Sequence, residues 1–189
     1  YWDPNNICIP IEDCDSNLEA TLSFGEIDLE SQTIEIKLEN SAPVSAFQFE
    51  LTICSDDSID FVDVYGGSSG DAGFAVAIGP NNIVVGYSDS GDEIPAGSDV
   101  LAIVDYVGGT ASAKICFANP IITSGYSGNP PPTFYVEYWD CNTISHLQGD
   151  LNMDQELNVI DIVIMVDIIL ENQIPDDYQI WAADYFYDG

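Results

Sequence analysis

The chain has 189 residues, of which 33 are acidic and only two, Lys37 and Lys114, are basic, so its net charge is −31. This balance excludes nucleic-acid binding by phosphate neutralisation and argues against docking on anionic lipid, because almost no cation is available. The hydrophobic content of 46% is enough for the core of one or two domains. The acidic residues therefore serve as a solubilising surface for salty surroundings or, in part, as ligands of divalent cations.

Two further features bear on location. No run of 18 apolar residues occurs, so we expect no membrane-spanning helix. Five cysteines in a Lys-poor acidic chain favour an oxidising environment, and we predict an extracellular or cell-surface protein.

Residues 1–17 form an irregular leader that contains two prolines and three asparagines. Cys8 and Cys14 lie close together within it, and we predict a local disulfide, Cys8–Cys14. A metal site would need more Cys or His nearby.

Residues 18–141 show the period-2 alternation of half-buried strands. In "TIEIKLEN", for example, Ile34, Ile36 and Leu38 alternate with charged residues. Similar stretches, separated by Gly, Pro, Asn and Ser, cover residues 20–29, 33–40, 46–54, 59–65, 73–79, 82–88, 99–107, 113–118 and 133–139. We predict a mainly β fold, an antiparallel immunoglobulin-like β-sandwich of about nine strands without a helix among them. Residues 66–73 and 88–99 are expected to be loops.

Three cysteines fall in or beside these strands. Cys116 lies in a late strand and Cys141 follows the next one, so we predict a Cys116–Cys141 disulfide. Cys54 is then left as a buried thiol at a strand end. A Cys54–Cys116 pair is the competing arrangement, and sequence alone leaves both open.

A twelve-residue window from Asp150 to Asp161 has the spacing of a calcium loop. Such loops supply side-chain oxygens at positions 1, 3 and 5, a carbonyl at 7 and a carboxylate at 12. These positions hold Asp150, Asn152, Asp154, Glu156 and Asp161, and we predict that they bind one Ca²⁺. An apolar helix should follow, from about residue 159 to 170. Position 6 usually needs glycine but is Gln155, which must adopt an unfavourable backbone conformation. The alternative is an Asp/Asn-rich loop that merely caps a helix.

The phrase "GDLNMDQELNVIDIVIMVDIIL" resembles one half of a type I dockerin repeat, a calcium loop followed by one helix. A dockerin carries two such halves, and "WAADYFYDG" is similar to the start of the second. The resemblance would make Asp184 and Asp188 ligands of a second calcium ion. Phe186 stands where a ligand is expected, so this second site departs from the pattern.

The larger domain resembles the cohesins, the receptors of dockerins. The resemblance rests on "LSFGEIDLESQTIEIKLENSAPVSAFQFELTI" and "NIVVGYSDSGDEIPAGSDVLAIVDYV", with the family's "VSAFQF" and "IPAGSxVL" motifs. It implies a cohesin-like sandwich at residues 18–141, a linker at 142–148 and a dockerin-like region at 149–189.

Catalysis is not indicated. The only histidine, His146, lies just before the calcium loop without a nucleophile motif, and we interpret it as a surface linker residue. No GxSxG, HExxH or phosphate-binding loop occurs.

We therefore predict a non-enzymatic structural protein whose partners are other protein subunits. These are copies of itself, joined head to tail into filaments, or a separate cohesin or dockerin partner. The alternative is a module that binds glycans or surfaces, for which the aromatic candidates are Tyr65, Tyr87, Tyr126, Tyr135, Tyr138 and Trp139.

Overall fold

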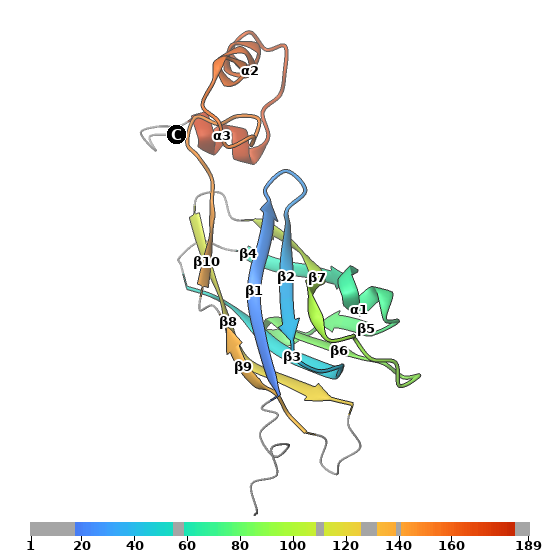
Figure 1. Ribbon diagram of the computed structural model, residues 1–189. Coiled ribbons are helices and arrows are strands. Elements are labelled where there is room, and N and C mark those ends of the chain that lie inside the picture. Colours follow the sequence, from blue (N-terminus) through green and yellow to red (C-terminus); the bar gives the residue numbers. More distant parts are fainter. Residues whose placement is uncertain (1–17, 55–58, 109–111, 126–131, 139–140, 184–189) are drawn as a thin grey trace, which may run out of the picture.

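Alternating strands build two sheets that pack face to face in the computed structural model, which describes residues 18–54, 59–108, 112–125, 132–138 and 141–183 (Figure 1). Sheet A has the spatial order β4 (Ile59–Tyr65), β7 (Gly97–Gly108), β2 (Thr33–Asn40), β1 (Glu19–Asp28) and β9 (Tyr135–Tyr138). Sheet B has the order β10 (Cys141–Ser145), β8 (Ser112–Ser124), β3 (Val44–Ile53), β6 (Ile83–Tyr87) and β5 (Ala75–Ile78). The predicted β-sandwich is confirmed.

The core lies between the sheets and follows the predicted alternation. In β2 the side chains of Ile34, Ile36 and Leu38 are buried, while the charged residues between them are directed outward. Phe47 lies opposite Gly86 in the β3–β6 pair, and a Cβ at Gly86 would collide with its ring. Glycine at this position therefore lets an aromatic side chain pack flat against the neighbouring strand.

Three details differ from the sequence prediction. Strand β10 occupies residues expected to form a linker, because it pairs with β8 from Cys141 to Ser145. Strand β9 pairs with β1 in parallel, so the sheets are not wholly antiparallel. A short 3-10 turn, η1 (Pro80–Asn82), and a one-turn helix, α1 (Gly67–Asp71), also interrupt the strands.

Helix α1 lies in the segment 66–73 that was expected to be a loop. Gly66 and Gly67 both have positive φ, and a Cβ at Gly67 would collide with the backbone of Leu101 on β7. The buried hydroxyl of Ser69 donates to the carbonyl oxygen of Gly66 at 2.9 Å. Close packing on β7, rather than helix propensity, explains this turn of helix.

A small C-terminal unit lies beyond one end of the sandwich, past the turn that joins β1 and β2 (Figure 1). It consists of the loop that follows Gly149 and two helices, α2 (Val159–Ile169) and α3 (Asp177–Ala183). The predicted helix after the loop is confirmed as α2. Among the described residues, no helix is both long and apolar enough to cross a membrane.

Candidate functional site

The candidate calcium loop is organised around its first residue. Asp150 is only 1% exposed, and its two carboxylate oxygens accept the backbone N–H groups of Asp154 at 3.2 Å and Gln155 at 2.7 Å. These bonds fold the chain back over Asp150. The loop thus closes around the side chain that occupies position 1.

The last residue of the loop joins it to helix α2. Asp161 is 3% exposed, and its carboxylate accepts the N–H groups of Leu151 and Asn158, each at 2.8 Å. The Asn158 side chain in turn accepts the N–H of Ile160, which completes a capping box. Helix capping, the alternative considered from sequence, is therefore one role of Asp161.

Gln155 adopts the backbone conformation that the calcium-loop spacing requires. Its φ is +64°, in the left-handed region that glycine normally occupies. For a residue with a side chain this costs about 1 kcal/mol. The predicted strain at position 6 is confirmed.

The remaining candidate ligands lie on the outer side of the loop. Asn152 donates its amide N–H to Asp154 Oδ2 at 2.7 Å, and Asp154 Oδ1 accepts the N–H of Glu156 at 2.9 Å. The hydrogen bond from Asn152, followed by that from Glu156, lowers the pKa of the Asp154 carboxyl group below its usual value. Asp154 is therefore held in its charged form.

The candidate ligands are of the right chemical type for a hard cation, but their side chains do not converge on one point. All five candidates offer oxygen, the donor that Ca²⁺ prefers. Each carboxylate oxygen that accepts one N–H keeps a further lone pair. Across the described part of the chain, however, no three His, Cys, Asp or Glu side chains converge as a metal site requires. Calcium binding thus stays a prediction.

Helix α3 supports the loop from behind. Tyr178 donates its hydroxyl to the carbonyl oxygen of Asp150 at 2.8 Å, and Gln179 donates to that of Leu151 at 3.1 Å. Burial, then the negative charges of Asp150 and Asp161, raises the pKa of Tyr178 to about 12. The sequence analysis did not predict these hydrogen bonds from α3, because the aromatic residues of α3 were the only local signal.

His146 belongs to this unit rather than to an exposed linker. Its ring centroid lies 5.0 Å from that of Tyr178 and 6.3 Å from that of Trp181. Trp181 lies in α3, directly before the segment that resembles the start of a second calcium loop. The doubtful ligands Asp184 and Asp188, like the Cys8–Cys14 pair, lie outside the described residues.

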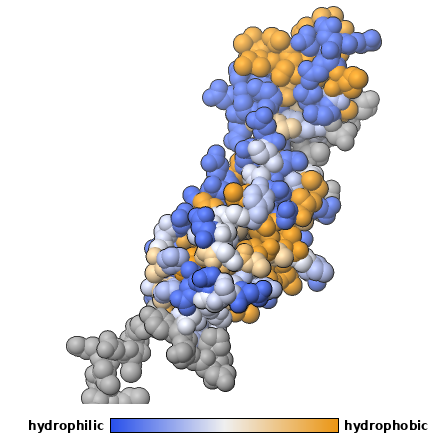
Figure 2. Space-filling model, turned by 90° about the vertical axis from the view of Figure 1, so that its right-hand side faces the viewer, coloured by the Kyte–Doolittle hydropathy of each residue, from blue (hydrophilic) through white to orange (hydrophobic). Residues whose placement is uncertain are grey.

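Helix α2 carries an apolar stripe that faces solvent, and Figure 2 shows hydrophobic residues at the surface of the C-terminal unit, at the top of the view. The stripe comprises Val159, Ile162, Val163, Val166, Ile169 and Leu170, which are 45–70% exposed. Their spacing of three and four residues places them on one side of the helix. The candidate ligand Asp161 lies on the buried side of the same helix.

A second surface, made of uncharged residues, covers part of the outer face of sheet B, with Glu50 beside it on β3. The strand registers place Ala77, Val85, Gln48 and Ile121 in one row across four strands, with Ala75, Tyr87, Ala46 and Thr123 in the next. We call these eight residues the sheet B patch. None of them is charged, which is unusual in a chain with 33 acidic residues.

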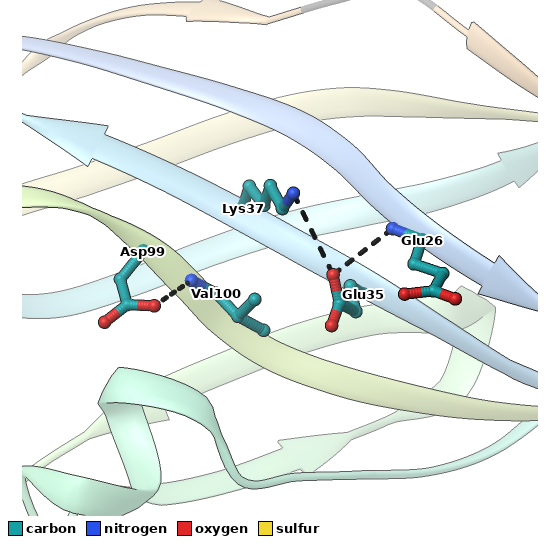
Figure 3. Close-up of polar contacts among 5 residues, drawn as sticks. All are labelled: Glu26, Glu35, Lys37, Asp99 and Val100. Carbon is teal, nitrogen blue, oxygen red and sulfur yellow. Dashed lines mark hydrogen bonds and ion pairs between the residues drawn. The ribbon is translucent and has the colours of Figure 1, made fainter.

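The outer face of sheet A is charged by contrast (Figure 3). Glu35 Oε2 lies 4.0 Å from the Lys37 ammonium nitrogen and accepts the N–H of Glu26 at 3.2 Å. Asp99 accepts the N–H of Val100 at 2.8 Å. Of the two outer faces, sheet B is therefore the one suited to apolar docking.

The candidate glycan-binding aromatics do not gather in one place. Tyr65 lies on β4, Tyr87 on β6, and Tyr135 and Tyr138 on β9, all with exposed side chains. They thus belong to both sheets, and Tyr126 and Trp139 lie outside the described residues.

The predicted Cys116–Cys141 disulfide is present. Cys54 is a free thiol, as predicted, but it is exposed rather than buried because it lies just past the end of β3. Its sulfur atom is 3.3 Å from that of Cys116.

No known family model matches the chain, and no curated protein is significantly similar to it. Among solved structures, a non-cellulosomal cohesin from the hyperthermophilic archaeon Archaeoglobus fulgidus is 20% identical, with a TM-score of 0.50, and the match covers 67% of this chain and 90% of the cohesin. A type II cohesin domain from the cellulosome of Acetivibrio cellulolyticus is 10% identical, with a TM-score of 0.43, and covers 72% and 97% respectively. The two five-stranded sheets, with short C-terminal helices beyond them, form a cohesin-like β-sandwich.

Proposed function

We propose that this chain is a non-catalytic extracellular assembly protein. In this proposal the apolar stripe of α2, positioned by the calcium-bound loop, docks on the sheet B patch of the next copy. The single observation that carries it is the presence of two exposed uncharged surfaces, the stripe and the patch, on one chain. The contact joins different surfaces of two copies, so it is heterologous, and it generates a filament when the rotation between successive copies does not close a ring.

Hydrophobic burial supplies the attraction. The six stripe residues are each about half exposed, so covering them contributes roughly 1 kcal/mol per side chain. The total of about 6 kcal/mol lies near the lower estimates of the cost of association. Burial of the patch side chains and a weaker charge repulsion between copies must therefore supply the rest of the binding free energy.

Charge makes the association conditional. Copies that each carry −31 repel one another. Calcium bound at Asp150, Asn152, Asp154, Glu156 and Asp161 would add positive charge beside the stripe, and salt shortens the Debye length to about 10 Å at 0.1 M. We expect assembly to need calcium, salt or both.

Sedimentation velocity of the full chain, with millimolar calcium or with chelator, tests the proposal. Ile162→Asn in the stripe should abolish oligomers, whereas Ile174→Asn, at a 93% exposed position outside it, should not. In the patch, Ile121→Asn should abolish them, whereas Val62→Asn, of matched exposure on sheet A, should not.

Mixing the two inactive variants gives the sharpest result. Ile162→Asn keeps an intact patch and Ile121→Asn keeps an intact stripe, so together they should form a one-to-one complex and nothing larger. A wild-type chain that stays monomeric at high concentration in calcium and salt would exclude this function.

A further inference from the structure

Three cysteine sulfurs meet across three neighbouring strands of sheet B. Cys141 on β10 lies directly opposite Cys116 on β8, to which it is disulfide-bonded. Cys54 lies on the other side of β8, immediately after the end of β3. Its Sγ is 3.3 Å from Cys116 Sγ, which is closer than the sum of the van der Waals radii of two sulfur atoms. The disulfide is therefore in contact with a free thiol.

We propose that these residues form a thiol–disulfide exchange relay. The Cys54 thiol loses its proton to solvent, and the thiolate attacks Cys116 Sγ. The Cys54–Cys116 bond forms as the Cys116–Cys141 bond breaks, and the electron pair leaves on Cys141 Sγ, which takes up a proton. One disulfide and one thiol are present before and after, so the step needs no oxidant or reductant.

The backbone holds the attacking thiol in place. The N–H of Cys54 donates to the carbonyl oxygen of Lys114 at 2.8 Å, which extends the β3–β8 pairing to Cys54 itself. Thr52 lies opposite Cys116, and its hydroxyl donates to the Cys116 carbonyl oxygen at 3.3 Å. The sulfur of Cys54 thus stays beside Cys116 without any rearrangement of the sheet.

Solvent can reach both sulfur atoms that alternate as the free thiol, so the exchange can run in either direction. Cys54 is exposed, whereas Cys116 is buried between its two partners. Cys141 is only partly buried, so the released thiol can be reached by solvent. The central sulfur is protected from external thiols, and the outer two are the ones that react with solutes.

The exchange changes how the C-terminal unit is attached. Strand β10 lies at the edge of sheet B, pairs only with β8 among the described strands, and leads directly into the loop before Asp150. The Cys116–Cys141 bond ties this edge strand covalently to the sandwich. The Cys54–Cys116 bond instead joins two strands that already pair extensively, so β10 is left held by hydrogen bonds alone.

Alkylation mapping of the full wild-type chain tests the relay. The protein is incubated without reductant and trapped with a maleimide. It is then cut with proteases specific for acidic residues, since two lysines give trypsin too few sites. We expect two isomers: linked Cys116–Cys141 with labelled Cys54, and linked Cys54–Cys116 with labelled Cys141.

The matched variant is Cys54→Ser, which should reduce labelling of Cys141 at least tenfold because no attacking thiol remains. Cys141→Ser should form the Cys54–Cys116 disulfide in a glutathione redox buffer. If Cys141→Ser does not fold, the wild-type mapping decides alone. Finding only Cys116–Cys141 in the wild-type chain, with no labelled Cys141, overturns the proposal.

Discussion

Tyr178 donates a hydrogen bond to the carbonyl oxygen of Asp150 at 2.8 Å, across 28 residues of sequence. The same end of the loop is joined to α3 by a bond from the Gly149 N–H to the carbonyl oxygen of Ala182 at 2.9 Å. The loop is therefore held against α3, and the first candidate ligand is supported by a helix that follows the loop in sequence.

Tyr178→Phe should destabilise this unit by about 1 kcal/mol, because the Asp150 carbonyl oxygen loses its buried donor while the ring is kept. Amide hydrogen exchange at Gln155 and Leu151 should become faster, and exchange in β3 should not change. Tyr87→Phe, which removes an exposed hydroxyl, is the control. Equal effects of the two changes would show that the hydrogen bond does not hold the loop.

Asp154→Asn should remove the response to calcium while preserving the apo structure. The side chain is exposed, and the amide keeps one oxygen to accept the Glu156 N–H although it loses the second oxygen, which accepts from Asn152. The denaturation midpoint in chelator should therefore change little. In calcium the wild-type unit gains stability by mass action and the variant does not. Asp167→Asn, on α2 outside the loop, is the control for charge. Differential scanning calorimetry with and without calcium measures this, and an unchanged calcium response in Asp154→Asn would remove that residue from the ligand set.

Tyr106→Phe should stabilise the sandwich. Tyr106 is 1% exposed, and its hydroxyl has no hydrogen-bond partner among the described residues. Removing a buried unpaired hydroxyl should raise the free energy of unfolding by about 1 kcal/mol at neutral pH, as measured by urea titration. A loss of stability instead would reveal a partner for this hydroxyl.

The same variant should change the alkaline limit of stability. Burial, then the charge of Asp28, raises the pKa of Tyr106 to about 12 from its ordinary value of 10. The folded state thus favours the neutral phenol. Ionisation of this group therefore leaves the free energy of unfolding unchanged below pH 10 and lowers it as the pH rises from 10 to 12. The wild-type chain should lose stability more steeply than Tyr106→Phe over this interval. If the free energies of unfolding of the two proteins fall in parallel between pH 10 and 12, the raised pKa of Tyr106 is contradicted.

Cys141→Ser should destabilise the protein less than the double variant Cys54→Ser/Cys141→Ser, in which neither the Cys116–Cys141 bond nor a Cys54–Cys116 bond can form. The Cys116–Cys141 bond spans 25 residues and contributes roughly 3 kcal/mol in the chain-entropy model. Cys54 and Cys116, 62 residues apart, could replace it with a bond worth roughly 4 kcal/mol. Under oxidising conditions Cys54→Ser/Cys141→Ser should therefore unfold at lower denaturant concentration than Cys141→Ser alone. Identical midpoints would mean that no replacement bond forms.

Local patterns in the sequence were sufficient to predict most of the strands and helix α2. Alternation around Ile34, Ile36 and Leu38 identifies β2, since side chains on a strand reverse face at every residue. The 1-3-5-7-12 spacing identifies the loop and the start of α2, because all of its residues lie within one short segment. The helix α1 and strand β10 have no such local signal, and both depend on packing or pairing with a distant strand.

The relationships that carry the proposed functions were decided only by the tertiary structure. Val85, Gln48 and Ile121 form one row because hydrogen bonds set the registers of β6, β3 and β8, which are remote in sequence. Cys54 was assigned to a buried strand end, yet the order β10-β8-β3 leaves it exposed beside the disulfide. A residue's own sequence neighbours determine whether it joins a strand or a helix. Its neighbours in space depend on strand order and register, which arise from pairing between distant segments.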